Sequence, residues 1–129
     1  MSRKEEAEHL LKRSKEFLET AEYQISRGLY GIAVFSLEQA LQLFLKSKML
    51  IAGVDYPRTH GVRTLLEILS DVESDEKKRG IKHMLNDYLL ELGMLEDAYI
   101  TSRYVMREFT SEEAQRLAKT VKEVMNNVK

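Results

Sequence analysis

The stretch FSLEQALQLFLK, residues 35–46, decides the fold. It predicts a helix that is apolar on most sides and carries one thin polar stripe. Glu38, Gln42 and Lys46 are spaced four apart, and residues at that spacing share one helix face. A helix that is apolar on most sides is normally buried at the centre of a protein. We expect its polar stripe to face water, to meet a partner or to build a site.

The composition excludes several classes of protein. The chain has 129 residues, 32% of them charged, and a formal net charge of −1, so no overall positive field attracts nucleic acid. Cysteine is absent, which excludes disulfides, thiol catalysis and thiolate metal sites. The apolar region 32–54 is interrupted by Glu38, Lys46 and Lys48, so a membrane span is not expected. No apolar signal core begins the chain, and a cytoplasmic location is the expectation.

The periodicity of apolar residues predicts about five helices and no strands. Helices are expected at about 4–26 and 32–51, with Gly53 as the stop of the second. A short helix around 62–69 follows, with Thr59 as its N-cap. A long helix is expected from 75 to about 106, with Ser74 as its cap, and a last one after the capping box at Thr110.

Short connections between long helices favour antiparallel neighbours. We therefore predict an all-α fold, an up-and-down antiparallel bundle of about five helices. At this length the chain is expected to form one domain over residues 1–129.

Several short motifs occur in a fixed order along the chain. They are Gly28-Leu-Tyr30, Ser36-Leu-Glu38-Gln39-Ala40, Lys46, Pro57-Arg-Thr59-His60 and Ser102-Arg103-Tyr104. Together they resemble the HEPN domain, a small helical bundle, over nearly the whole chain. Two departures from the family pattern are Ser102, where alanine is common, and the absence of proline after Tyr104.

The resemblance implies a homodimer in which the central helices form much of the interface. It also implies an association with a nucleotide or RNA, and with a minimal nucleotidyltransferase in toxin–antitoxin-like modules. Some members are metal-independent ribonucleases that carry an arginine, four to six residues, then a histidine. Arg79 and His83 are separated by only three residues, and Arg3 and His9 fit the spacing in the first helix rather than the late helices. The sequence therefore favours a protein without this catalytic arrangement.

Four residues are candidates for ligand binding: Lys46, His60, Arg103 and Tyr104. Cationic groups suit phosphate, and an aromatic face suits base stacking. Each has a simpler alternative, because Lys46 could lie on a solvated face or in a dimer seam and His60 could cap a helix locally. Arg103 could pair with Asp97, and Tyr104 could belong to the core.

Three residues beside Lys46 are candidates for a dimer interface: Glu38, Gln39 and Gln42. They could equally satisfy one another along the helix.

The remaining charged motifs favour simpler explanations. Lys77, Lys78, Arg79, Lys82 and His83 form a basic patch that could meet RNA or an acidic partner, although a solvated face is the favoured explanation. Glu6 and His9 make one Glu-x-x-His motif, whereas di-iron bundles need two such motifs and further glutamates. No phosphate-binding glycine loop is present. We therefore expect neither a metal nor a cofactor.

Three functions remain open from the sequence. The leading hypothesis is a non-catalytic HEPN protein that binds a nucleotide or RNA, or a nucleotidyltransferase partner. The second is a ribonuclease with a non-standard site that uses His60 or His83 as general base. The third is a dimeric structural adaptor that is indifferent to nucleotides.

Overall fold

The chain folds into six α-helices in the part that the computed structural model describes, residues 2–58, 61–104 and 108–128, with the backbone alone for residues 100–104. No strand occurs within those ranges. The helices are α1 (Arg3–Ser26), α2 (Tyr30–Ile51), α3 (Val62–Val72), α4 (Asp75–Asp87), α5 (Leu89–Tyr104) and α6 (Ser111–Asn127). The predicted all-α class is confirmed, with six helices in place of about five.

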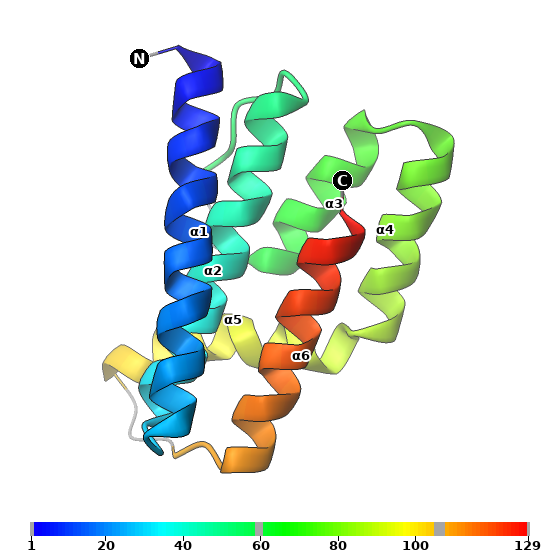
Figure 1. The fold of residues 1–129 in the computed structure, drawn as a ribbon. Coiled ribbons are helices and arrows are strands. Elements are labelled where there is room, and N and C mark those ends of the chain that lie inside the picture. Colours follow the sequence, from blue (N-terminus) through cyan, green and yellow to red (C-terminus); the bar gives the residue numbers. More distant parts are fainter. Residues whose placement is uncertain (1, 59–60, 105–107, 129) are drawn as a thin grey trace.

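Helix α2 lies at the centre of the bundle and contacts α1, α3, α5 and α6. Figure 1 shows α1 and α2 side by side and antiparallel, with α6 beside α2. The α3–α4 hairpin lies on the side of the bundle away from α1. Helix α5 runs across the lower part of this arrangement. The central position agrees with the apolar composition of α2, since Leu37, Leu41, Leu45 and Met49 are fully buried at a spacing of four. Each such side chain contributes about 2 kcal/mol on burial.

Small residues at a spacing of seven bring α1 and α2 close together. They are Ala7, Ser14 and Ala21 on α1 and Ala33, Ala40 and Ser47 on α2, all buried. The hydroxyl of Ser14 donates to the carbonyl of Ala40 at 2.6 Å, and that of Ser47 donates to the carbonyl of Ala7 at 2.9 Å. A seven-residue repeat keeps one seam of each helix facing its neighbour, and this seam fixes the rotation of α2.

The helix ends follow most of the predicted caps. Gly53 follows the end of α2 with φ +85°, a conformation that glycine adopts without strain. The capping box at Thr110 is present, because Thr110 Oγ1 accepts from the Glu113 N–H at 3.1 Å and Glu113 Oε1 accepts from the Thr110 N–H at 2.9 Å. Ser74 is at the N-cap of α4, without a side-chain bond. Gly61 is the N-cap of α3, and Thr59, predicted for that role, lies outside the described residues.

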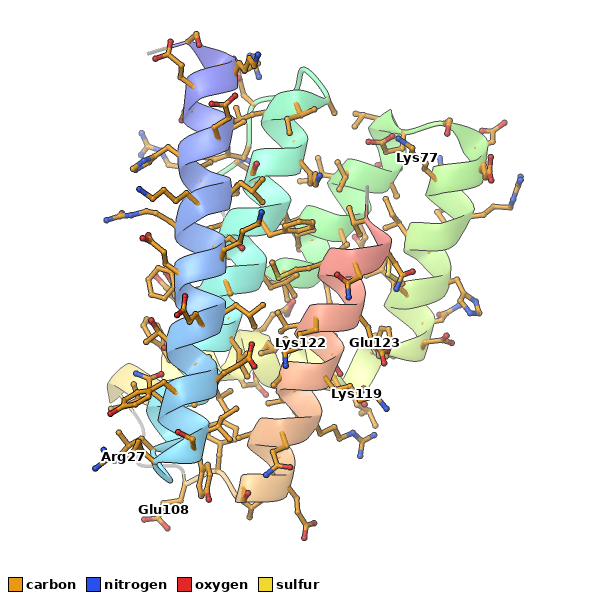
Figure 2. The ribbon with its side chains drawn as sticks, in the orientation of Figure 1. Arg27, Lys77, Glu108, Lys119, Lys122 and Glu123 are labelled. Carbon is orange, nitrogen blue, oxygen red and sulfur yellow. The ribbon has the colours of Figure 1, made fainter. Side chains whose placement is uncertain are left out.

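The prediction of one continuous helix from 75 to about 106 was wrong. The chain breaks at Tyr88 between α4 and α5, although no proline or glycine marks the position. Residues on both sides of the break contact α6. The Tyr88 hydroxyl donates to Glu123, which Figure 2 shows on the side of α6 toward α4, and Arg116 pairs with Glu91 at 2.8 Å. Tertiary contacts of this kind override a local helical pattern.

Candidate functional site

A line of hydrogen-bonded polar side chains is buried along α2. Lys46 Nζ donates to Gln42 Oε1 at 3.0 Å, and Gln42 Nε2 donates to Glu38 Oε2 at 2.9 Å. Gln39 Nε2 donates to the other carboxylate oxygen of Glu38 at 2.7 Å. The spacing of four residues brings consecutive groups within reach. We call Glu38, Gln42 and Lys46 the polar chain.

The polar chain is enclosed by the rest of the molecule. The exposed fractions are 0% for Glu38, 4% for Gln42 and 8% for Lys46. Buried polar groups are costly unless they are hydrogen-bonded, and no buried side-chain nitrogen or oxygen of the described residues lacks a partner. Of the three outcomes expected for this polar stripe, exposure to water is therefore excluded. Its members form hydrogen bonds with one another.

Burial changes the protonation behaviour of both ends of the polar chain. It raises the pKa of Glu38 from an ordinary value of 4.5 to about 7, and the bonds from Gln42 and Gln39 together with the charge of Lys46 oppose the shift. Burial lowers the pKa of Lys46, and the charge of Glu38 opposes that shift. A buried acid that titrates near neutral pH is a common feature of functional sites.

The connection between α2 and α3 covers the Lys46 end. Lys46 Nζ lies 5.2 Å from the ring centroid of Tyr56, within the range of a cation–π interaction. The Tyr56 hydroxyl donates to Glu6 Oε1 at 2.9 Å, and this bond raises the pKa of Tyr56. Residues of α1, α2 and the connection therefore meet around the ammonium group.

An ion pair between α3 and α5 lies near the Glu38 end. Arg63 Nη2 and Glu96 Oε1 are 2.8 Å apart, with side chains 41% and 20% exposed. The charge of Glu96 contributes to the raised pKa of Glu38. Sequence reasoning missed Arg63, Glu96 and Tyr56, because the partners in these contacts are 33 and 50 residues apart and no local motif links them.

The structure brings together some of the predicted site residues, and the others lie outside its described part. Lys46, Glu38 and Gln42 come together in the polar chain. His60 lies outside the described residues. Arg103 and Tyr104 belong to the last turn of α5, and their side chains lie outside the described part of the molecule.

A partly exposed stripe runs along α2 beside the polar chain. It consists of Ile32, which is 57% exposed, and the half-buried Phe35, Gln39 and Leu43. The ring of Phe35 lies 6.2 Å from that of Tyr99 on α5, centroid to centroid. We call these four residues of α2 the α2 stripe. Three of the four residues are apolar, and a partly exposed apolar stripe on a central helix is a candidate protein interface.

The basic patch lies on α4, and three of its five members have an acidic neighbour. Lys77 is 3.8 Å from Glu73, and Figure 2 shows it at the upper end of α4. Lys78 is 3.8 Å from Asp71. His83 is 2.9 Å from Asp87, with its side chain 75% exposed. These pairs fit the favoured explanation of a solvated face.

Neither metal ligation nor membrane insertion is indicated by the described part of the chain. No three His, Asp or Glu side chains gather there in an arrangement suited to a metal ion. None of the helices described is both long enough and apolar enough to cross a lipid bilayer.

Comparisons with known proteins place the chain in a family. The crystal structure of TT1696 from Thermus thermophilus is similar to this chain with a TM-score of 0.76, over 95% of this chain and 94% of that one, at 24% sequence identity. That likeness concerns the fold. A search of curated proteins finds no match. The model of the HEPN domain matches residues 7–129, and the chain therefore belongs to the HEPN domain family.

Proposed function

We propose that residues 1–129 form one HEPN domain that acts without catalysis as a homodimeric binding protein for a nucleotide or RNA. The polar chain of α2 carries this proposal. It places two ionisable groups, Glu38 and Lys46, on a buried face of α2. Apolar residues alone would suit such a face. Buried ionic groups are often less stabilising than apolar residues of similar size, so a role in binding explains their presence.

Lys46 is the proposed phosphate contact. Its ammonium group has three donors, and one of them bonds to Gln42. Its side chain is 8% exposed, so access for a phosphate requires the connection at Tyr56 to move away from the ammonium group. A cationic donor held in a desolvated setting binds phosphate more strongly than one in water.

His60, Arg103 and Tyr104 are proposed as further contacts. Gly61, which follows His60 in sequence, lies close enough to α5 that an added Cβ would be 3.6 Å from Glu96 Oε2. Arg103 follows Glu96 by seven residues, two turns along α5. The α2–α3 connection and α5 therefore border the same region as the polar chain.

Replacing Lys46 with methionine should weaken nucleotide binding about tenfold or more, which corresponds to roughly 1.4 kcal/mol. The measurement is an NMR titration of amide-labelled protein with 5′-AMP and with the dinucleotide UpU. Saturable shifts are expected near Lys46, His60 and Arg103. Lys48→Met is the matched control, because Lys48 lies on the same helix with its ammonium 5.3 Å from the ring centroid of Phe44.

Other outcomes of the titration would redirect the proposal. Equal losses in both variants would place the contact elsewhere. The absence of shifts in the wild type at millimolar ligand would favour the adaptor hypothesis. The search would then turn to a protein partner such as a minimal nucleotidyltransferase of a toxin–antitoxin-like module.

The α2 stripe is the proposed dimer seam. Replacing Ile32 with glutamate should raise the dimer dissociation constant at least about tenfold, because a charge would be buried without a partner. Ile51→Glu is the control, since Ile51 is a similarly exposed isoleucine (65%) of α2 outside the stripe. Sedimentation equilibrium measures both. A dimer unaffected by Ile32→Glu, or weakened equally by both changes, would exclude the stripe as the seam.

A further inference from the structure

The connection between α2 and α3 is held in place over Lys46 by its side chains. The backbone of residues 55–58 forms no hydrogen bond with the backbone of any other described residue. The last such bond before this segment runs from the Val54 N–H to the Met49 carbonyl at 3.0 Å. We call residues 55–58 the cover. A segment without backbone hydrogen bonds opens at a lower free-energy cost than a packed helix does.

Two side-chain bonds attach the cover to the first turns of α1. Arg3 Nη2 donates to Asp55 Oδ1 at 2.8 Å, and the Tyr56 hydroxyl donates to Glu6 Oε1 at 2.9 Å. Figure 1 shows the beginning of α1 and the end of α2 at the same upper end of the bundle, where the connection leaves α2. We call these two bonds the latch.

The two bonds of the latch differ in strength. The side chains of Arg3 and Asp55 are 45% and 88% exposed, and an ion pair so exposed to water contributes little. Tyr56 and Glu6 are half-buried, and a bond from a hydroxyl to a carboxylate is assisted by the charge. The bond between Tyr56 and Glu6 is therefore the stronger part of the latch.

Tyr56 is the residue of the cover that contacts Lys46. Its ring centroid lies 5.2 Å from Lys46 Nζ, while its hydroxyl is bonded to Glu6 on α1. One side chain therefore joins the latch to the ammonium group. Lys46 is only 8% exposed, so the position of the Tyr56 ring decides how much of the ammonium group a ligand reaches.

We propose that the cover is a gate to Lys46 that the latch keeps closed: release of the bond between Tyr56 and Glu6 lets the ring move aside and exposes the ammonium group. A phosphate that binds beside Lys46 needs the open form, so its apparent affinity is reduced by the fraction of molecules that are open. This second part rests on the proposed function. The first part concerns the protein alone and is tested without a ligand.

The first experiment measures the rate at which formaldehyde and a borane reductively methylate Lys46, with each lysine resolved by mass spectrometry. The reagent is kept dilute, so that the cover closes again faster than Lys46 reacts and the rate reports the open fraction. Tyr56→Phe removes the hydroxyl but keeps the ring and every charge, and it should raise the rate at Lys46 about fivefold. Asp55→Asn should raise it no more than about threefold, because its ion pair is exposed.

Glu22→Gln is the matched control for these variants. It also removes a side-chain bond of α1, the one that Glu22 accepts from Lys122 on α6 at 3.0 Å, and it leaves the latch intact. The rate at Lys46 should therefore stay that of the wild type. An increase as large as that of Tyr56→Phe would overturn the inference, because any loosening of α1 would then expose Lys46.

Two further comparisons separate the gate from a general loss of stability. Glu6→Ala removes the acceptor of the bond that Tyr56→Phe breaks, so the double variant should react no faster than the faster single variant. Opening of the cover exposes little surface, so the rate at Lys46 should change little in dilute urea. An unchanged rate in Tyr56→Phe, rates that multiply in the double variant, or a rate that rises with urea as steeply as global unfolding would each overturn the gate.

The second experiment compares the affinity of the wild type and of Tyr56→Phe for UpU. The variant should bind up to about fivefold more tightly, in proportion to its open fraction, and Lys46→Met should remove this gain. An affinity that is unchanged or weaker in Tyr56→Phe would overturn the link between the gate and binding. If neither protein binds UpU or 5′-AMP, the proposed function and this link are both wrong, while the methylation rates still decide whether the latch closes the cover over Lys46.

Discussion

Raising the pH from about 5 to about 8 should lower the free energy of unfolding by roughly 2 to 3 kcal/mol. Glu38 is fully buried, and burial raises its pKa from 4.5 to about 7. Between these two values the folded chain holds a proton that the unfolded chain has released. The resulting stabilisation is fully present below the unfolded pKa and is lost as the pH rises through the folded pKa.

Urea denaturation at several pH values measures this effect. The protein concentration is kept constant, because the proposed dimer would make the apparent stability depend on it. Glu38→Gln has no proton to lose at this position and should remove most of the pH dependence. If the slope persists in Glu38→Gln, another group is responsible and Glu38 does not titrate as its surroundings indicate.

The helices of this fold could be predicted from local patterns, and the break within the fourth predicted helix could not. Apolar spacing and caps such as Gly53 and Thr110 act within a few residues of the chain, so they are visible in the sequence. At the break, the Tyr88 hydroxyl donates instead to Glu123, 35 residues away. A pattern with an uninterrupted apolar stripe carries no sign of such a contact.

The candidate site was likewise predictable in one part only. A spacing of four places Glu38, Gln42 and Lys46 on one face of a helix, whatever surrounds it. Whether that face is buried depends on where the neighbouring helices lie, and only the structure shows that Glu38 is completely enclosed. Residues 33 apart, such as Arg63 and Glu96, meet because α3 packs on α5, and neither stands in a motif that points to the other.

Replacing Gln42 with leucine should lower the free energy of unfolding by roughly 3 kcal/mol. Gln42 is the link between the two charged ends, since it accepts from Lys46 and donates to Glu38. Its loss leaves the buried ammonium without this hydrogen bond and leaves the carboxyl group of Glu38 with the bond from Gln39. Gln24→Leu is the matched control, because Gln24 accepts from the neutral Ser36 hydroxyl at 2.8 Å and its loss should cost only about 1 kcal/mol.

Replacing the whole polar chain should have the opposite effect. With leucine at Glu38, Gln42 and Lys46 together, the free energy of unfolding should equal that of the wild type or exceed it by up to about 4 kcal/mol, because no buried charge remains. Binding of UpU should be lost in the same variant. If the triple leucine variant has a lower free energy of unfolding than the wild type, the polar residues serve the packing of the bundle. The observation that carries the proposed function would then be explained by the fold alone. A stable triple variant that no longer binds would instead separate the two roles, because α2 would hold the bundle together without the residues that recognise the ligand.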